Sequence, residues 1–563
     1  MAITTHSDRG SRRVSALCRP GAAFVLLAVA AAVRAQQPTP PLAMPGQSAA
    51  PAGTAAAGAA PAAAASAPAA APEVARRPPF LQPGISVSVV ASDNAALAPD
   101  DAKRSDAIGQ VTLDLRMRSR GPRLTIEGDV GADFIGYARD SAADHVLPRG
   151  NLDLGATLVE RALFLEAGVE AARTRADPLL PFTGEASTAN TVSSVTWRAS
   201  PYFEHDFTPN VSALVRSDTL LTRNTSSDPD VAPPVGSTVQ REIVRVERRP
   251  APVGLALEAS REETTYEDET VTPLMIESAR ATVSVGVDQE LLFGAVGGRD
   301  HAEYGGTTTD ETIYGGLMQW RPSPRTAFDV EVEHRFFGTG FNIHFRDRLP
   351  RSVIDLSLQR AATATPSSIG LPEATTDPAA LLNTLLSTRV PDLNARDAAV
   401  DEISESRSLP GSMARPVDIF TQTPQLATTG RLDLLLNGTR NTLLGSLFYV
   451  KATVLPGTLV APVGPENFDS RQWGGSLGWY HRLSPQAAAA AEITYADVEA
   501  LGDRSGDTSR QWIATLSLSR RVNPDMTLSC GLRHLSARVT LASAGTAFDV
   551  DENQVFAGLR MQY

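Results

Sequence analysis

The chain has 563 residues and a formal net charge of −12 at pH 7, with 42 Gly, 40 Pro and only 6% aromatic residues. An acidic surface repels phosphate backbones, so this charge argues against a nucleic-acid-binding protein. The mean hydropathy of −0.11 is that of a soluble chain, but it does not exclude a transmembrane β-barrel, whose alternating apolar and polar residues cancel in the average.

Residues 1–35 are predicted to be a signal peptide. A basic segment precedes the apolar run 21–33, which is too short to span a bilayer, and Val33-Arg34-Ala35 approximates a small-x-small cleavage site. Ser11-Arg12-Arg13 resembles a twin-arginine motif, but we favour an ordinary Sec signal, because a barrel must cross the inner membrane unfolded. The basic residues are Arg9, Arg12, Arg13 and Arg19.

Residues 36–79 are predicted to be a disordered periplasmic linker. They are almost entirely Ala, Pro, Gly, Ser and Gln, so they lack the apolar side chains that a folded core needs. Alanine alone would favour a helix, but the interspersed prolines interrupt it. The composition does not decide whether this linker spans the periplasm or docks to an inner-membrane complex.

Residues 80–563 are predicted to form one large antiparallel transmembrane β-barrel, an all-β fold. Apolar residues alternate with polar or charged ones in 111–118 and 124–134, on either side of a turn at 119–122. This pattern is typical of a hairpin with one apolar and one wet face. Many such segments are long enough to cross a bilayer at a tilt, which favours a barrel over a soluble β-sandwich. The alternation recurs at 152–169, 279–287, 328–333, 473–479 and 555–563.

The connections alternate between tight turns and long loops, as in barrels with short periplasmic turns and longer outer loops. Counting strands back from Tyr563 gives about 22, with a range of about 16–24, and places both ends in the periplasm. We therefore expect the protein in the cell outer membrane, with its apolar face against outer-membrane lipid and its charged face on a wet lumen. The charged residues expected in the lumen are Asp114, Arg116, Glu127, Asp129, Asp329, Glu331 and Glu333.

The last strand ends in an aromatic residue that follows alternating apolar ones. This arrangement resembles the C-terminal signal by which the barrel-assembly machinery recognises its substrates, so we expect that machinery as a partner. The residues that make up this expected assembly signal are Val555, Ala557, Leu559, Met561 and Tyr563.

A long irregular segment, 361–427, interrupts the strands. Asp377-Pro378 is a good helix start, with Asp as the cap and Pro at the first position. The leucines that follow line one helical face. Two placements remain open: the segment folds into the lumen as a plug, or it covers the barrel as an extracellular lid. The leucines are Leu381, Leu382, Leu385 and Leu386.

No residues are arranged for catalysis or cofactor binding. Gly474 to Gly478 matches G-x-S-x-G, but Ser476 lies inside an alternating strand, whereas a nucleophile elbow needs a sharp strand-to-helix turn. Cys18 leaves with the signal peptide, and Cys530 alone forms no intramolecular disulfide. We expect no enzyme, no cofactor and no metal. The histidines without metal-ligand or triad spacing are His334, His344 and His481.

Three short motifs occur in the middle of the barrel. The first is a Pro-rich tight turn at 320–326, interpreted as turn chemistry with an interfacial Trp, or else as a docking site for a periplasmic partner. The second, at 335–338, is expected to be an extracellular hairpin with aromatics at the membrane interface. The third is the turn at 438–442. The motif residues are Trp320, Arg321, Pro322, Arg325, Arg335, Phe336, Phe337, Gly338, Arg440, Asn441 and Thr442.

Together, these motifs and the basic turn 346–351 resemble the outer-membrane protein family associated with the PEP-CTERM/exosortase system. The likeness covers roughly residues 83–563 and includes the segment 92–97 and the turn 159–161. The resemblance implies a place in exopolysaccharide production and in protein sorting to the envelope.

We therefore expect the barrel to export or anchor envelope polymer, most directly exopolysaccharide, with periplasmic export components as further partners. Two alternatives stay open. A general diffusion porin would conduct small solutes through an open lumen without a partner. A structural or assembly barrel would present sorted surface proteins and conduct nothing.

Overall fold

The computed structural model describes residues 80–139, 141, 144–175, 177–181, 191–226, 235–267, 273–363, 377–414, 424–455 and 469–562. The expected signal peptide 1–35 and linker 36–79 lie outside these residues, and so does Tyr563.

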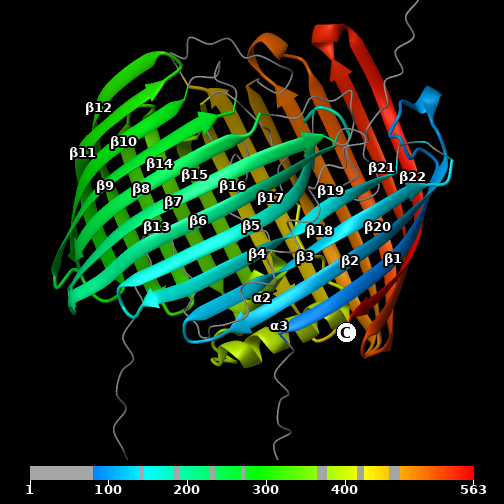
Figure 1. Ribbon diagram of the computed structural model, residues 1–563, viewed down its shortest axis with the longest axis horizontal. Coiled ribbons are helices and arrows are strands. Elements are labelled where there is room, and N and C mark those ends of the chain that lie inside the picture. Colours follow the sequence, from blue (N-terminus) through cyan, green and yellow to red (C-terminus); the bar gives the residue numbers. More distant parts are fainter. Residues whose placement is uncertain are drawn as a thin grey trace, which may run out of the picture.

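The described chain forms one closed antiparallel barrel of 22 strands (Figure 1). Each strand pairs with the next in sequence, and the last strand, β22 (Thr546–Gln562), returns to the first, β1 (Leu81–Ser92), with Val87 opposite Leu559. Closure leaves no free sheet edge, which is what a sheet in hydrocarbon requires. The predicted fold and the count of about 22 strands are confirmed.

The remaining strands follow in chain order. They are β2 (Asp106–Arg120), β3 (Leu124–Tyr137), β4 (His145–Val159), β5 (Leu163–Arg175), β6 (Thr191–Thr208), β7 (Val211–Ser226), β8 (Ser237–Arg248), β9 (Val253–Tyr266), β10 (Leu274–Gly286), β11 (Leu291–Tyr304), β12 (Thr307–Ser323), β13 (Thr326–Arg335), β14 (Gly338–Arg348), β15 (Ser352–Thr363), β16 (Gln425–Asn437), β17 (Asn441–Val454), β18 (Ser470–Ser484), β19 (Ala487–Ala500), β20 (Thr508–Asn523) and β21 (Met526–Leu541). Between β15 and β16 lie two helices, α2 (Pro378–Leu386) and α3 (Leu393–Arg407).

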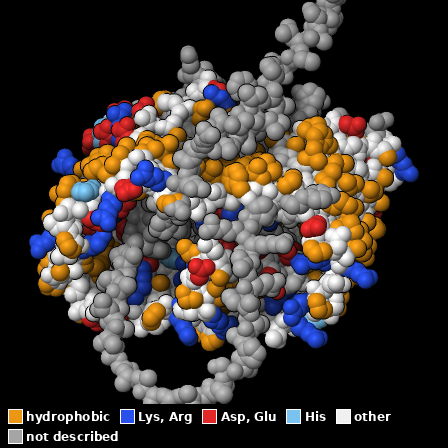
Figure 2. Space-filling model, turned by 60° about the horizontal axis from the view of Figure 1, so that its bottom comes forward, with side chains coloured by type: hydrophobic (Ala, Val, Ile, Leu, Met, Phe, Trp, Pro, Cys, Tyr) orange, Lys and Arg blue, Asp and Glu red, His pale blue; other side chains and the backbone are white. Residues whose placement is uncertain are grey.

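The outer wall of the barrel carries exposed apolar side chains. Val87 on β1 lies opposite Val111 on β2, and both are exposed, as are Leu257 on β9 and Leu516 on β20. Apolar side chains gather over the wall in Figure 2, while charged ones gather around the end of the barrel that faces the viewer. A closed barrel with such a wall is solvated by lipid, and the protein is an outer-membrane β-barrel.

Exposed tryptophans lie near both ends of the wall. Trp320 and Trp479 lie toward the short turns, and Trp473 and Trp512 lie on the other half of their strands. Amphipathic rings in these positions sit at the two membrane–water interfaces.

The two ends of the barrel differ in their connections. At one end, called here the short-turn end, the turns are as short as Pro209-Asn210, and β1 begins and β22 ends there. Longer connections, such as 93–105, lie at the opposite, long-loop end. In outer-membrane barrels the short turns face the periplasm. The irregular segment expected at 361–427 is shorter at both ends, because β15 continues to Thr363 and β16 already begins at Gln425, and β4 begins at His145, before the alternation that the sequence shows from 152.

Candidate functional site in the barrel lumen

The inner wall of the barrel carries paired charges, as the alternation predicts. Arg118 and Glu127 approach to 3.5 Å and Arg116 and Asp129 to 3.8 Å across the β2–β3 pair. Asp114 is fully buried, with Arg560 of β22 at 3.5 Å. Charges of both signs therefore alternate around the lumen and largely neutralise one another.

The two helices lie at the short-turn end of the barrel, below the lumen in Figure 1. The segment that contains the helices leaves β15 and enters β16 at the opposite, long-loop end. The predicted helix start is confirmed: Asp377 caps α2 by accepting a 2.7 Å hydrogen bond from the Ala379 N–H, and Pro378 takes the first position. Burial raises the pKa of Asp377, although hydrogen bonds from the backbone N–H groups of Ala379 and Ala380 act in the opposite direction. No helix in the described parts of the chain is long and apolar enough to cross a membrane.

Apolar packing fixes the helical hairpin (α2 and α3) to one side of the lumen. The four leucines of α2 are buried, and Leu382 is 0% exposed. They pack with Val400 of α3 against inward-facing side chains of β15 to β19. Complete burial of one leucine contributes about 1.5–3 kcal/mol, so this side is the strong attachment. The strand residues in this contact are Val353, Leu435, Leu444, Tyr480 and Ala490.

Arg407 joins the end of α3 to the turn between β16 and β17. Its guanidinium donates to the carbonyl oxygen of Gly438 at 2.9 Å, and also to the side chains of Asn437 and Thr442. Burial lowers the pKa of Arg407, with a further contribution from nearby Arg482. Thr442, which the sequence motif singled out, thus serves as an anchor for the hairpin.

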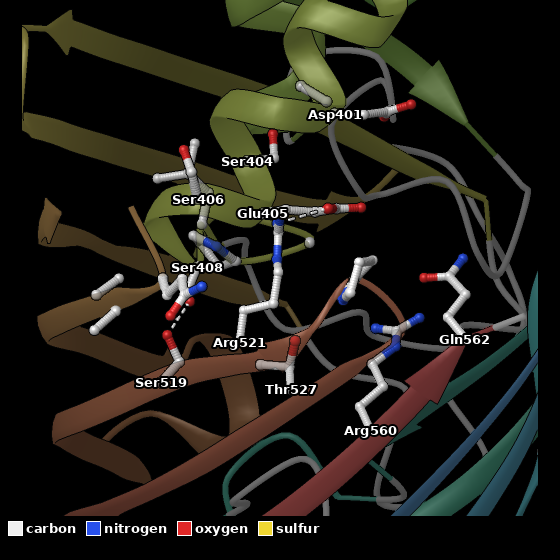
Figure 3. Close-up of a pocket in the computed structure, with 18 of the residues that line it drawn as sticks. Asp401, Ser404, Glu405, Ser406, Ser408, Ser519, Arg521, Thr527, Arg560 and Gln562 are labelled. Atoms are coloured by element: carbon white, nitrogen blue, oxygen red, sulfur yellow. Dashed lines mark hydrogen bonds and ion pairs between the residues drawn. The ribbon is translucent and has the colours of Figure 1, made fainter. Parts of the chain in front are cut away.

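Ion pairs extend the attachment of α3 further around the wall, to β20 and to β2. Asp401 of α3 accepts from Arg118 of β2 at 2.8 Å, and Asp397 accepts from the neighbouring Arg120. Glu405 accepts from Arg521 of β20 at 2.9 Å, as the upper dashed line in Figure 3 shows. β20 is the direct neighbour of β19, whereas β2 lies further around the wall, beyond β21, β22 and β1, so the hairpin reaches from β15 and β16 to β2 across part of the mouth of the barrel.

A cavity of about 410 Å³ remains between α3 and the wall formed by β20–β22. Figure 3 shows it lined by hydroxyls of α3 and by guanidinium groups of the wall. Ser408 and Ser519 share a hydrogen bond at its margin. Its hydrophilic residues include Arg116, Ser404, Ser406, Arg521, Thr527, Arg560 and Gln562.

The Pro-rich turn also lies beside the hairpin. The carbonyl oxygen of Pro324 accepts from Arg348 at 3.2 Å, and Arg348 donates to the Thr384 carbonyl of α2, again at 3.2 Å. Arg321 forms two hydrogen bonds with Asp329, at 2.7 and 2.9 Å. Trp320 is 44% exposed on the wall, in agreement with an interfacial position.

The remaining motif residues in this region have local partners. Asn441 accepts from the Trp479 indole at 3.0 Å and lies 2.7 Å from the His481 ring. The amide of Arg482 donates to the carbonyl of Arg440 at 2.8 Å, and the Arg325 side chain lines a small cavity beside α2.

The motif 335–338 joins β13 and β14 in a hairpin at the long-loop end, as expected, but Phe336 and Phe337 do not face the membrane interface, so the expected direction of these rings is wrong. Both pack with Leu274 and Tyr304 in an inward-facing cluster at the long-loop end. A Cβ added at Gly340 would lie 3.2 Å from the Phe337 ring, which therefore occupies the space that this glycine leaves open. Strand alternation stops at the two-residue turn, so it does not predict the direction of these rings.

The C-terminal residues of the expected assembly signal lie on β22, between β1 and β21. Val555 and Ala557 are exposed, and Leu559 and Met561 are half-buried and paired with Val87 and Ile85. They face the lipid side of the wall. Their recognition by assembly machinery remains a proposal.

Ser476 lies inside β18, where its hydroxyl and that of Ser446 are 2.9 Å apart. Among the described residues no group of three or more His, Cys, Asp or Glu side chains could hold a metal ion.

No family model matches the chain, and no curated protein sequence matches it. Three of the similar solved structures are from Pseudomonas aeruginosa. The outer membrane protein OpdK is 10% identical, with a TM-score of 0.31 over 86% of this chain and 99% of that chain. A mutant ferric enterobactin receptor, PfeA, is 10% identical, with a TM-score of 0.41 over 85% and 81%. The siderophore receptor PirA is 8% identical, with a TM-score of 0.33 over 87% and 81%. These values carry no assignment of cargo.

Proposed function

We propose that this outer-membrane barrel is a passage for envelope polymer, with exopolysaccharide as the cargo, and that the helical hairpin narrows its periplasmic mouth. The observation that carries the proposal is the span of the hairpin over part of that mouth, from the contacts of α2 with β15 and β16 to the ion pairs of α3 with β2. A barrel of 22 strands has a lumen too wide to be filled by its own wall side chains, so it holds water or a plug.

The contacts of the hairpin support a constriction inside the lumen and not a lid outside the barrel. Its leucines pack against inward-facing strand residues, and its acids pair with inward-facing arginines. The polymer as cargo rests on the sequence resemblance to the exosortase-associated family, and the balanced charges of the lumen wall are compatible with a neutral or weakly charged chain.

Planar-bilayer conductance of the purified barrel tests this function. A variant with 365–420 replaced by a short Gly-Ser linker should conduct more than the wild type, and exopolysaccharide should block the current. The variant is folded if its migration on a gel still changes when the sample is heated, as it does for the wild type. Unchanged conductance means that the hairpin is not a constriction; current indifferent to polymer favours a general porin, and no current in either protein favours the structural role.

We also propose that the residues from Val555 to Tyr563 direct assembly by the barrel-assembly machinery. The positions of Val555, Ala557, Leu559 and Met561 on the outer face of the last strand support this, because the strand that closes the barrel is the one that an assembly partner has to hold. Replacing Tyr563 with Ala should lower the amount of barrel in the outer membrane, while the purified variant still refolds in detergent. An unchanged membrane level contradicts the proposal.

A further inference from the structure

We infer that the lumen contains a binding site for a neutral saccharide segment, in a cavity of about 620 Å³ called here the wall cavity. The inference rests on the proposed function, which it extends by naming residues that contact the cargo. The wall cavity lies between β7–β10 and β13–β15 and includes the motif residues Arg335, Phe336 and Phe337. Its volume lies within the range of ordinary small-molecule sites, about 300–1,000 Å³.

Five of the six arginines that line the wall cavity have a carboxylate partner within 4 Å. Arg245 lies 2.8 Å from Glu247 and 3.6 Å from Glu258, and Arg335 lies 2.6 Å from Asp300. An incoming ion would therefore have to displace an existing partner, whereas an apolar ligand would strip these groups of water without replacing their hydrogen bonds. A neutral ligand rich in hydroxyls does neither. The five arginines within 4 Å of a carboxylate are Arg216, Arg241, Arg245, Arg280 and Arg335.

Arg280 is held flat against the wall. From β10 it reaches Glu333 on β13, with Nη1 3.1 Å from both carboxylate oxygens, and it donates to Glu258 on β9 at 2.7 Å. The intervening strands carry Gly298 and Gly315, where a Cβ would collide with a neighbouring backbone oxygen. Planar donors and acceptors fixed in this way are preorganised for hydroxyl groups, because no side-chain entropy is lost when a ligand binds.

Two aromatic rings complete the cavity. The rings of Phe336 and Phe337 are 5.1 Å apart and nearly perpendicular, and the Arg335 guanidinium lies 6.0 Å from the centre of the Phe337 ring. A pyranose has a face of C–H groups, which packs on an aromatic ring, and an edge of hydroxyls, which bonds to planar polar groups. Asn342 and Gln359 supply further amides around the cavity. This combination fits a sugar better than an ion or a lipid.

Saturation-transfer NMR and equilibrium titration of the detergent-purified full chain test the site, with maltohexaose and cellohexaose as probes and polyethylene glycol of similar size as the non-binding control. The wild type should bind at least one hexasaccharide. The variant Phe336→Ala/Phe337→Ala should bind about tenfold more weakly, which corresponds to a loss of about 1.4 kcal/mol from the contacts with the two rings. The matched control is Phe293→Ala on the lipid-facing wall, which should bind like the wild type.

If the double variant fails to fold, Glu331→Gln keeps the shape of a lining side chain and removes its charge, and it should weaken binding severalfold. The inference is overturned if neither hexasaccharide binds, or if binding is equal in the wild type and the variants. A barrel that conducts without binding sugar retains the proposed passage and loses this site. One that binds sugar without conducting retains the site and loses the passage.

Discussion

The guanidinium of Arg407, the last residue of α3, lies 2.9 Å from the carbonyl oxygen of Gly438 in the turn between β16 and β17. This contact ties the end of an inserted helix to a short turn at the periplasmic end, although the inserted segment leaves β15 at the opposite end. The position of the hairpin is therefore fixed by specific polar contacts as well as by its leucines.

Replacing Arg407 with Ala should loosen the hairpin without unfolding the barrel. The change leaves the Gly438 carbonyl and the Thr442 hydroxyl without their charged donor, a loss of about 1.5–3 kcal/mol. Hydrogen exchange of the amides in 393–407 should accelerate about tenfold or more. The exposed Arg440, in the same turn, provides the control, and Arg440→Ala should leave the exchange unchanged. Equal exchange in both variants would show that the contact contributes nothing.

The two attachments of the hairpin should differ in strength. Leu382→Ala empties a fully buried position and should destabilise the hairpin by about 2–5 kcal/mol. Asp401→Asn breaks a half-exposed ion pair with Arg118 and should cost at most about 1 kcal/mol, less in high salt. Limited proteolysis within 377–414 measures both effects. The opposite order would mean that the ion pairs are the principal attachment.

Much of the barrel follows from local pattern. Alternation and turn length predict the strand count, because the direction of each side chain in a strand depends only on its neighbours along the chain. The helix start at Asp377-Pro378 is equally local. The alternation in the sequence begins only at 152, although β4 begins at His145, because Pro148 lies inside this strand and proline is uncommon within strands.

The placement of the hairpin could not be predicted in the same way. Its ion pair between Arg118 and Asp401 joins residues 283 positions apart, and no local pattern specifies such a partner. The inward direction of Phe336 and Phe337 likewise depends on the space above Gly340 on the next strand. Both features define the lumen, so the sequence indicates the barrel better than the site.

Gly150 should be essential for the pairing of β3 and β4. It adopts φ +113°, and an added Cβ would collide with the carbonyl oxygen of Asp129 on β3. Gly150→Ala should therefore lower the refolding yield in detergent severalfold, because strand pairing has to shift. A Cβ added at Gly109 in β2 would meet no atom within 4 Å, so Gly109→Ala is the matched control and should refold normally. A normal yield for both variants would contradict the collision.

Asp507, just before β20, should make the stability of residues 542–545, which connect β21 and β22, sensitive to acid. Burial acts to raise its pKa, but hydrogen bonds from the Ser543 amide at 2.9 Å, the Ser543 hydroxyl at 2.7 Å and Arg504 at 3.0 Å outweigh burial and lower the pKa below 3.8. A carboxylate whose pKa is lower in the folded protein stabilises the fold at pH values above its pKa in the unfolded chain. This contribution is lost as the pH falls through the pKa of the folded state.

The stabilisation should therefore be constant from neutral pH to about pH 4 and disappear below it, because protonated Asp507 no longer accepts all three bonds. Hydrogen exchange of the amides in 542–545, followed from pH 5 to pH 2.5 after correction for intrinsic rates, should show protection falling in this window. Asp507→Asn keeps the size of the side chain and removes the titration, so its exchange should be raised already at pH 5 and should then change little. Parallel pH profiles in the two proteins would assign the acid sensitivity to another group.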